Sequence, residues 1–92
     1  DPGEPTYRRM EAAGFRSVYA AVHGEDPDVT WPSGLQAPAM DTDGIPECLD
    51  YIWIRGAIRA TDARLIFDRP AADDPTLYPS DHLGISAHLE IG

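Results

Sequence analysis

Three residues of this sequence have side chains and positions suited to catalysis: Asp50, Asp81 and His82. Asp81 and His82 stand directly before the alternating segment 84–91, so we expect a rigid strand to hold them toward a ligand. Asp50 is the one carboxylate in the apolar run 49–54, where an unpaired charge is costly. We therefore predict that Asp50 and His82 are hydrogen-bonded, carboxylate oxygen to ring nitrogen, at roughly 2.7–3.2 Å.

The first half of the chain predicts one short helix and one long loop. The helix is expected to start at Thr6 as its cap and to stop at Gly14. Segment 15–22 is apolar but irregular, and its pattern fits either a strand or a helical turn. Segment 24–47 is rich in Pro, Gly and Asp, which indicates a loop, and Trp31 is its natural anchor.

The second half predicts three strands in an antiparallel α+β arrangement. The clearest is Leu49 to Arg55, which ends at Gly56, and the next is Ala63 to Phe67. A loop at 68–81 precedes the last strand, in which apolar and polar residues alternate from Gly84 to Ile91. Because Asp50 is expected to meet His82, we predict that the strands at 49–54 and 84–91 share one sheet, adjacent or one strand apart.

Composition limits the classes of function. The 92 residues suffice for one domain or a piece of one, and 16 acidic residues against 7 arginines give a net charge of −9. That charge disfavours non-specific binding to nucleic acid, which depends on Lys and Arg meeting phosphates. The lone Cys48 excludes an internal disulfide, and no apolar run is long enough for a membrane span. Since the first residue is Asp1 and not Met, the natural start is expected upstream.

Two motifs about thirty residues apart carry a resemblance to a known family: Leu49-Asp50-Tyr51-Ile52-Trp53 and Pro79-Ser80-Asp81-His82-Leu83-Gly84-Ile85. Together with Gly14-Phe15 and Val29-Thr30-Trp31-Pro32, they resemble the C-terminal portion of an endonuclease/exonuclease/phosphatase domain, the DNase I-like superfamily. Its members include pancreatic-type DNases, apurinic endonucleases, deadenylases, neutral sphingomyelinases and inositol-polyphosphate phosphatases. The resemblance extends over most of the chain.

The resemblance implies a phosphoester hydrolase that works with Mg²⁺ or Mn²⁺ in a four-layer α/β sandwich, mainly of antiparallel sheet. It implies that His82 contacts the scissile phosphate or prepares the attacking water, that Asp50 orients the imidazole, and that Asp81 supports the metal or the water. The chemistry suits these residue types, because a carboxylate-held histidine keeps one tautomer and can stabilise an anionic transition state. A hard dication prefers oxygen ligands.

The chain also departs from the family pattern. The family carries a metal-binding Asn, a metal-binding Glu and a Gly-Asp-x-Asn motif in its first half, whereas this chain contains no Asn. The resemblance therefore implies that residues 1–92 are a C-terminal fragment without the N-terminal half, holding half of the active site and no tightly bound metal. An apolar sheet face left open by the missing half would then favour self-association.

Other interpretations stay open. Asp81 and His82 fit an Asx-turn followed by an ordinary histidine, and His88 with Glu90 fit a solvated strand face. The acidic balance favours a small phosphoester or a phospholipid head group over nucleic acid as the substrate. The alternatives are a nuclease of the same superfamily, with a basic groove from the missing half, and a non-catalytic binding module.

Overall fold

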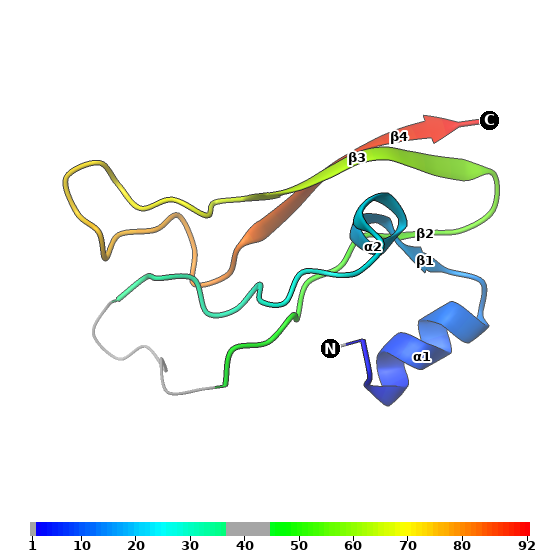
Figure 1. Cartoon of the computed structure of the whole chain (residues 1–92), viewed down its shortest axis with the longest axis horizontal. Coiled ribbons are helices and arrows are strands. Elements are labelled where there is room, and N and C mark those ends of the chain that lie inside the picture. The colour runs from blue at the N-terminus through cyan, green and yellow to red at the C-terminus, as the bar shows by residue number, and fades with distance from the viewer. Residues whose placement is uncertain (1, 37–44) are drawn as a thin grey trace.

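Two antiparallel two-stranded sheets and two short helices make up a small mixed α/β domain, seen in a computed structural model that describes residues 2–36 and 45–92 (Figure 1). The elements in chain order are α1 (Pro5–Ala12), β1 (Arg16–Ser17), α2 (Val18–His23), β2 (Trp53–Ile54), β3 (Ile58–Ile66) and β4 (Gly84–Ile91). The predicted antiparallel α+β class is confirmed at this level. No helix within the described ranges is both long and apolar enough to cross a lipid bilayer.

Strands β3 and β4 form the longer sheet. The predicted strand at Gly84–Ile91 is confirmed, and the strand predicted from Ala63 to Phe67 is longer, running from Ile58 to Ile66. The register changes between Ala60 and Asp62, so Thr61 is an extra residue of β3. Such a bulge keeps Ala60 and Ala63 on one face of the sheet despite their odd spacing.

The two faces of the β3–β4 sheet differ in chemistry. One face carries apolar residues of both strands, and Ala63 on it packs with Val18 and Ile54 to form the buried core. The opposite face carries charged side chains, paired as Arg59 with Glu90 and as Arg64 with Asp62. The expected open apolar surface is therefore not found on this face of the β3–β4 sheet in the described residues.

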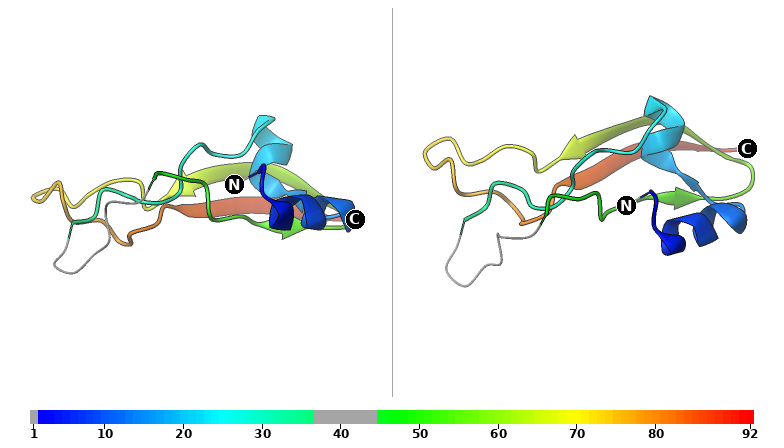
Figure 2. Two further views of the ribbon diagram at one scale, coloured as in Figure 1. Left: turned by 90° about the horizontal axis from the view of Figure 1, so that it is seen from below. Right: turned by 60° about the horizontal axis from the view of Figure 1, so that its bottom comes forward.

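Exposed apolar surface on β4 lies at its last residues instead. Leu89 is 43% exposed and Ile91 is 86% exposed. Both belong to the apolar face of the sheet. Figures 1 and 2 show α2 and the β1–β2 pair on one side of the β3–β4 sheet, with α1 beyond them.

The prediction that segments 49–54 and 84–91 share a sheet is wrong. Only Trp53 and Ile54 of the predicted strand are extended in a ladder, and they pair with β1, whereas β4 pairs with β3. The reason lies in the preceding residues, whose backbone groups bond to the loop around Thr30 and not to a strand. Neither segment is helical.

The N-terminal elements differ from the prediction in detail. Helix α1 begins at Pro5 after Glu4, not at Thr6, and Pro is well suited to the first helical position because its missing N–H needs no partner there. Gly14 follows the helix with φ +89°, a conformation that glycine adopts without strain. Segment 15–22, left open by the sequence, contains both β1 and the start of α2.

The predicted loop at 24–47 contains no helix and no named strand in its described parts, 24–36 and 45–47. Residues 37–44 lie outside the described residues. Trp31 anchors the loop through an isolated antiparallel bridge to Glu47, in which the backbone bonds measure 2.9 and 3.1 Å.

Candidate functional site

The predicted pair of Asp50 and His82 is formed. His82 Nδ1 lies 2.7 Å from Asp50 Oδ2, which confirms the predicted hydrogen bond. Each side chain is 38% exposed, so the pair is reachable from solvent. A carboxylate at Nδ1 favours the tautomer that carries its proton there and leaves Nε2 as the reactive nitrogen. Among the described residues, Nε2 has no hydrogen-bond partner.

Thr30 fixes the Asp50 side of the pair. Its Oγ1 accepts hydrogen bonds from the backbone N–H groups of Leu49, at 2.8 Å, and of Asp50, at 3.2 Å. Thr30 is fully buried. Because this one oxygen accepts two successive backbone N–H groups, it fixes the backbone at Leu49 and Asp50, where no strand pairing does so.

The same loop also fixes the His82 side. The carbonyl of Thr30 accepts a hydrogen bond from Leu83 N–H at 2.7 Å, and the carbonyl of Asp81 accepts one from Ser33 N–H at 2.7 Å. The Ser33 hydroxyl donates to the carbonyl of Ser80. Segment 30–33 thus lies between the two halves of the pair and bonds to both.

The third predicted site residue, Asp81, does not join the pair through its side chain. Its Oδ1 lies 3.4 Å from the Ser80 hydroxyl, and no bond to Asp50 or His82 is found within the described residues. The turn is closed by Ser80, whose Oγ accepts the N–H of His82 at 3.1 Å. The alternative interpretation expected an Asx-turn at Asp81, but the structure has the corresponding turn formed by the side chain of Ser80.

Asp81 also lacks the neighbours of a metal site. Across residues 2–36 and 45–92, no group of three or more His, Cys, Asp or Glu side chains is placed to hold a metal ion. Magnesium requires several oxygen ligands in near-octahedral geometry. The described residues therefore do not form such a site by themselves.

The other two histidines, His23 and His88, lie outside the Asp50–His82 pair. His23 Nε2 lies 2.6 Å from the carbonyl oxygen of Ala63, which joins α2 to β3. His88 and Glu90 lie on the charged face of β4, and Glu90 pairs with Arg59. Both strand residues are exposed, in agreement with the interpretation of a solvated face.

Comparison with known proteins does not assign this chain to a family. No family model, no curated protein and no solved structure matches this chain. The family resemblance therefore stays a hypothesis carried by the two motifs.

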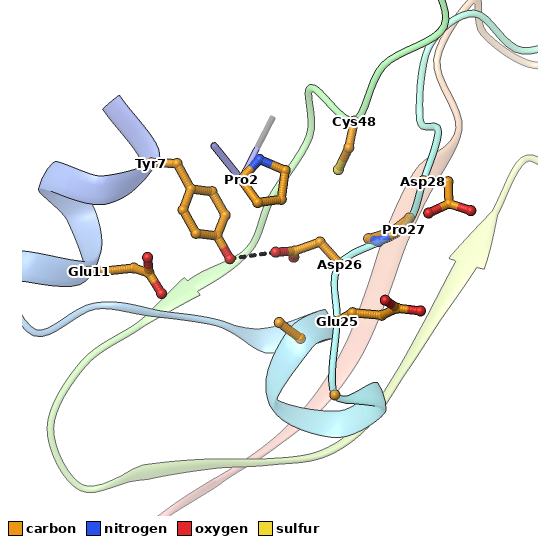
Figure 3. Close-up of a pocket in the computed structure, with 10 residues that line it drawn as sticks. Pro2, Tyr7, Glu11, Glu25, Asp26, Pro27, Asp28 and Cys48 are labelled. Atoms are coloured by element: carbon orange, nitrogen blue, oxygen red, sulfur yellow. Dashed lines mark hydrogen bonds between the residues drawn. The ribbon is translucent and has the colours of Figure 1, made fainter. Parts of the chain in front are cut away.

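The sequence missed a second polar cluster, centred on Asp26. Its carboxylate accepts hydrogen bonds from the hydroxyls of Tyr7 and Ser17, and so joins the loop after α2 to α1 and β1. Figure 3 shows the bond from Tyr7. Burial, and then the hydrogen bond to Asp26, raise the pKa of Tyr7 well above its ordinary value. These partners are distant in the sequence, and nothing in the local pattern around Asp26 indicates them.

A cavity of about 690 Å³ adjoins this cluster, and Figure 3 shows the acidic side chains around it. Glu11, Glu25 and Asp28 line it together with Asp26 and the buried Cys48. Burial raises the pKa of the Cys48 thiol, which disfavours the reactive thiolate. Cys48 is accordingly a structural residue of the cavity wall.

Proposed function

We propose that this chain carries the Asp-His half of the active site of a divalent-metal-dependent phosphoester hydrolase of the endonuclease/exonuclease/phosphatase type. The observation that supports it is the 2.7 Å contact between His82 Nδ1 and Asp50 Oδ2 in a partly exposed position. Under this proposal the two antiparallel sheets are part of a DNase I-like four-layer sandwich.

The chemistry follows from the tautomer. Asp50 accepts a hydrogen bond from Nδ1–H and stabilises the imidazolium, so protonated His82 can donate from Nε2 to a phosphate oxygen. A donor placed where negative charge develops lowers the energy of the phosphorane-like transition state. Neutral His82 can instead accept a proton at Nε2 and orient the attacking water.

Asp81 is proposed as the metal-side carboxylate, with its remaining partners supplied by the upstream half of the domain. A bound Mg²⁺ or Mn²⁺ would neutralise charge on the transferring group. The net charge of −9 favours a small phosphoester or a phospholipid head group over nucleic acid as the substrate. A nuclease and a non-catalytic binding module are the alternatives that experiment must separate.

The test uses the protein encoded by the full reading frame, assayed on bis-p-nitrophenyl phosphate and on duplex DNA with added Mg²⁺ or Mn²⁺. We expect His82→Ala to lower kcat/KM on the small diester by about 10²–10⁴-fold, the usual contribution of a positioned acid or base. His88→Ala is the matched control, because it removes an exposed histidine of β4, and should leave the rate unchanged. Equal activity of His82→Ala and wild type would overturn the proposal, and DNA cleavage alone would favour the nuclease.

A further inference from the structure

Three aromatic rings from two elements and the segment between them meet beside helix α1. Tyr7 packs edge-on against Tyr51 and Trp53, with ring centroids 5.3 and 5.0 Å away, and the centroids of Tyr51 and Trp53 lie 5.5 Å apart. Tyr7 comes from α1, Trp53 from β2, and Tyr51 from the residues just before β2. Such contacts are worth more than their buried area alone.

The hydroxyl groups of both tyrosines are held by hydrogen bonds. Tyr7 donates its hydroxyl hydrogen to Asp26, and Tyr51 donates to the carbonyl of Cys48 at 2.9 Å. Two hydrogen bonds and the ring packing therefore hold the cluster in one arrangement. A ligand that binds to these rings meets a site that needs little further ordering.

A small pocket of about 260 Å³ opens on these three rings. Met10, Leu49 and the carboxylate-bearing Glu4 complete most of its wall, and none of its lining residues is positively charged. One water takes about 30 Å³ in the liquid, so the pocket has room for the equivalent of roughly nine waters. That is the size of a small organic group, not of a peptide.

We propose that this pocket binds the quaternary ammonium group of a small molecule. The face of an aromatic ring is negative and attracts a cation that has been stripped of water, and Trp and Tyr are the strongest such faces. The side chains of Met10 and Leu49 are apolar contacts for the N-methyl groups. Glu4 adds negative charge to the wall, and the net charge of −9 makes a cation the favoured ligand.

This site is separate from the Asp50–His82 pair and does not depend on the proposed hydrolase function. Leu49 and Tyr51, the chain neighbours of Asp50, both line the pocket, whereas neither Asp50 nor His82 does. Binding is therefore measured without any turnover, and failure of one proposal leaves the other intact.

The experiment is an NMR titration of the chain with tetramethylammonium chloride at constant ionic strength. The indole N–H of Trp53 should shift saturably, while that of Trp31, which does not line the pocket, serves as an internal control. The neutral compound 3,3-dimethyl-1-butanol has a tert-butyl group of the same shape. Choline, which carries a trimethylammonium group in place of that tert-butyl group, is titrated in parallel. The neutral alcohol should bind about five- to thirty-fold more weakly than choline, because it lacks the cation–π attraction. Equal affinity for the two compounds would overturn the proposal, as would equal shifts of both indoles.

Two variants localise the binding. Trp53→Leu removes one ring, and we expect about tenfold weaker binding of tetramethylammonium. Because Trp53 also pairs with Ser17 in the β1–β2 ladder, a second variant, Glu4→Gln, removes a negative charge from the pocket wall and should weaken binding about two- to threefold. Glu11→Gln, which lies within α1 and lines the other cavity, is the matched control. Unchanged binding by both Trp53→Leu and Glu4→Gln would contradict the assignment.

Discussion

The hydroxyl oxygen of Thr30 holds the backbone of Asp50, with a hydrogen bond of 3.2 Å from the Asp50 amide. The same oxygen accepts the amide of Leu49, and the Thr30 carbonyl accepts that of Leu83. One buried residue therefore sets the separation between Asp50 and His82, which lie in different parts of the fold and share no sheet. This arrangement makes the Asp-His pair dependent on the loop around Thr30.

Thr30→Val should destabilise the protein by about 1–3 kcal/mol, since two amides lose their acceptor inside the protein. The change keeps the shape of the side chain but removes its oxygen. Urea unfolding followed by tryptophan fluorescence measures the loss. Thr30→Ser retains the oxygen and is expected to lose less stability. If Thr30→Val were as stable as wild type, the hydroxyl would not be holding these amides.

Asp50→Asn should change the unfolding free energy by less than about 1 kcal/mol, because a polar pair whose side chains are each 38% exposed contributes little. It should instead change the histidine tautomer. Long-range ¹H–¹⁵N NMR of the His82 ring is expected to show the proton on Nδ1 in wild type, and a mixture of tautomers in the variant. A wild-type ring protonated only on Nε2 would show that the pair does not form in solution.

Stability should fall in alkaline solution through Tyr7 and Tyr51. Burial raises the pKa of both side chains above the ordinary value of about 10, and Asp26 raises that of Tyr7 further. Below about pH 10 both folded and unfolded chains keep these hydroxyls protonated, so their contribution is complete. Above it the unfolded chain ionises first, and the contribution is lost as the pH rises toward the folded pKa.

Urea unfolding of wild type and Tyr7→Phe between pH 7 and pH 11 checks this pH dependence. Tyr7→Phe should be less stable at pH 7, because Asp26 loses one donor, and should lose less stability between pH 9 and pH 11 than wild type does. The matched control is Tyr19→Phe, which removes a hydroxyl from α2 and should keep the wild-type pH profile. Identical profiles for wild type and Tyr7→Phe would count against the Tyr7–Asp26 contact.

The chain of residues 1–92 should by itself show no turnover of bis-p-nitrophenyl phosphate with Mg²⁺ or Mn²⁺. Asp81, the carboxylate proposed to lie on the metal side, cannot hold a dication firmly without further oxygen ligands. Isothermal titration calorimetry should accordingly detect only weak Mg²⁺ binding. Turnover that survives purification and disappears in His82→Ala would mean that the chain holds a complete catalytic site.

Self-association is expected through the free edge of β4 rather than through its charged face. Gly92 N–H donates to the carbonyl of Ala57, so the backbone groups of Ile91 point away from β3 in the alternating ladder. The edge of β3 is covered, because Arg16 donates to the carbonyl of Ile58 at 2.6 Å. An exposed apolar edge strand is a template for pairing with another copy.

Sedimentation equilibrium should show reversible dimers that Ile91→Lys weakens at least severalfold, because a charged edge opposes pairing. Ser86→Lys adds the same charge to the opposite face of β4 and serves as the control. Dimers that persist equally in both variants would place the contact elsewhere, and a strict monomer would refute the prediction.

The sequence alone determined two features of this protein. The alternation from Gly84 to Ile91 predicted β4 with its bounds, since side chains two apart in a strand share a face whatever the partner. The pairing of Asp50 with His82 was also predictable, because a lone carboxylate in an apolar run needs a polar partner. Both conclusions depend on local pattern or on the general cost of an unpaired charge.

Only the tertiary structure decided how those features are brought together. The apolar run from Leu49 fits a strand, but its amides are bonded to Thr30, and β2 is left with Trp53 and Ile54. Likewise, nothing near Asp26 indicates its bond to Tyr7, nineteen positions away. The physical reason is that a backbone N–H or a hydroxyl can form a hydrogen bond with any acceptor at the right distance and angle. Which acceptor lies there depends on the packing of segments that are distant in the sequence.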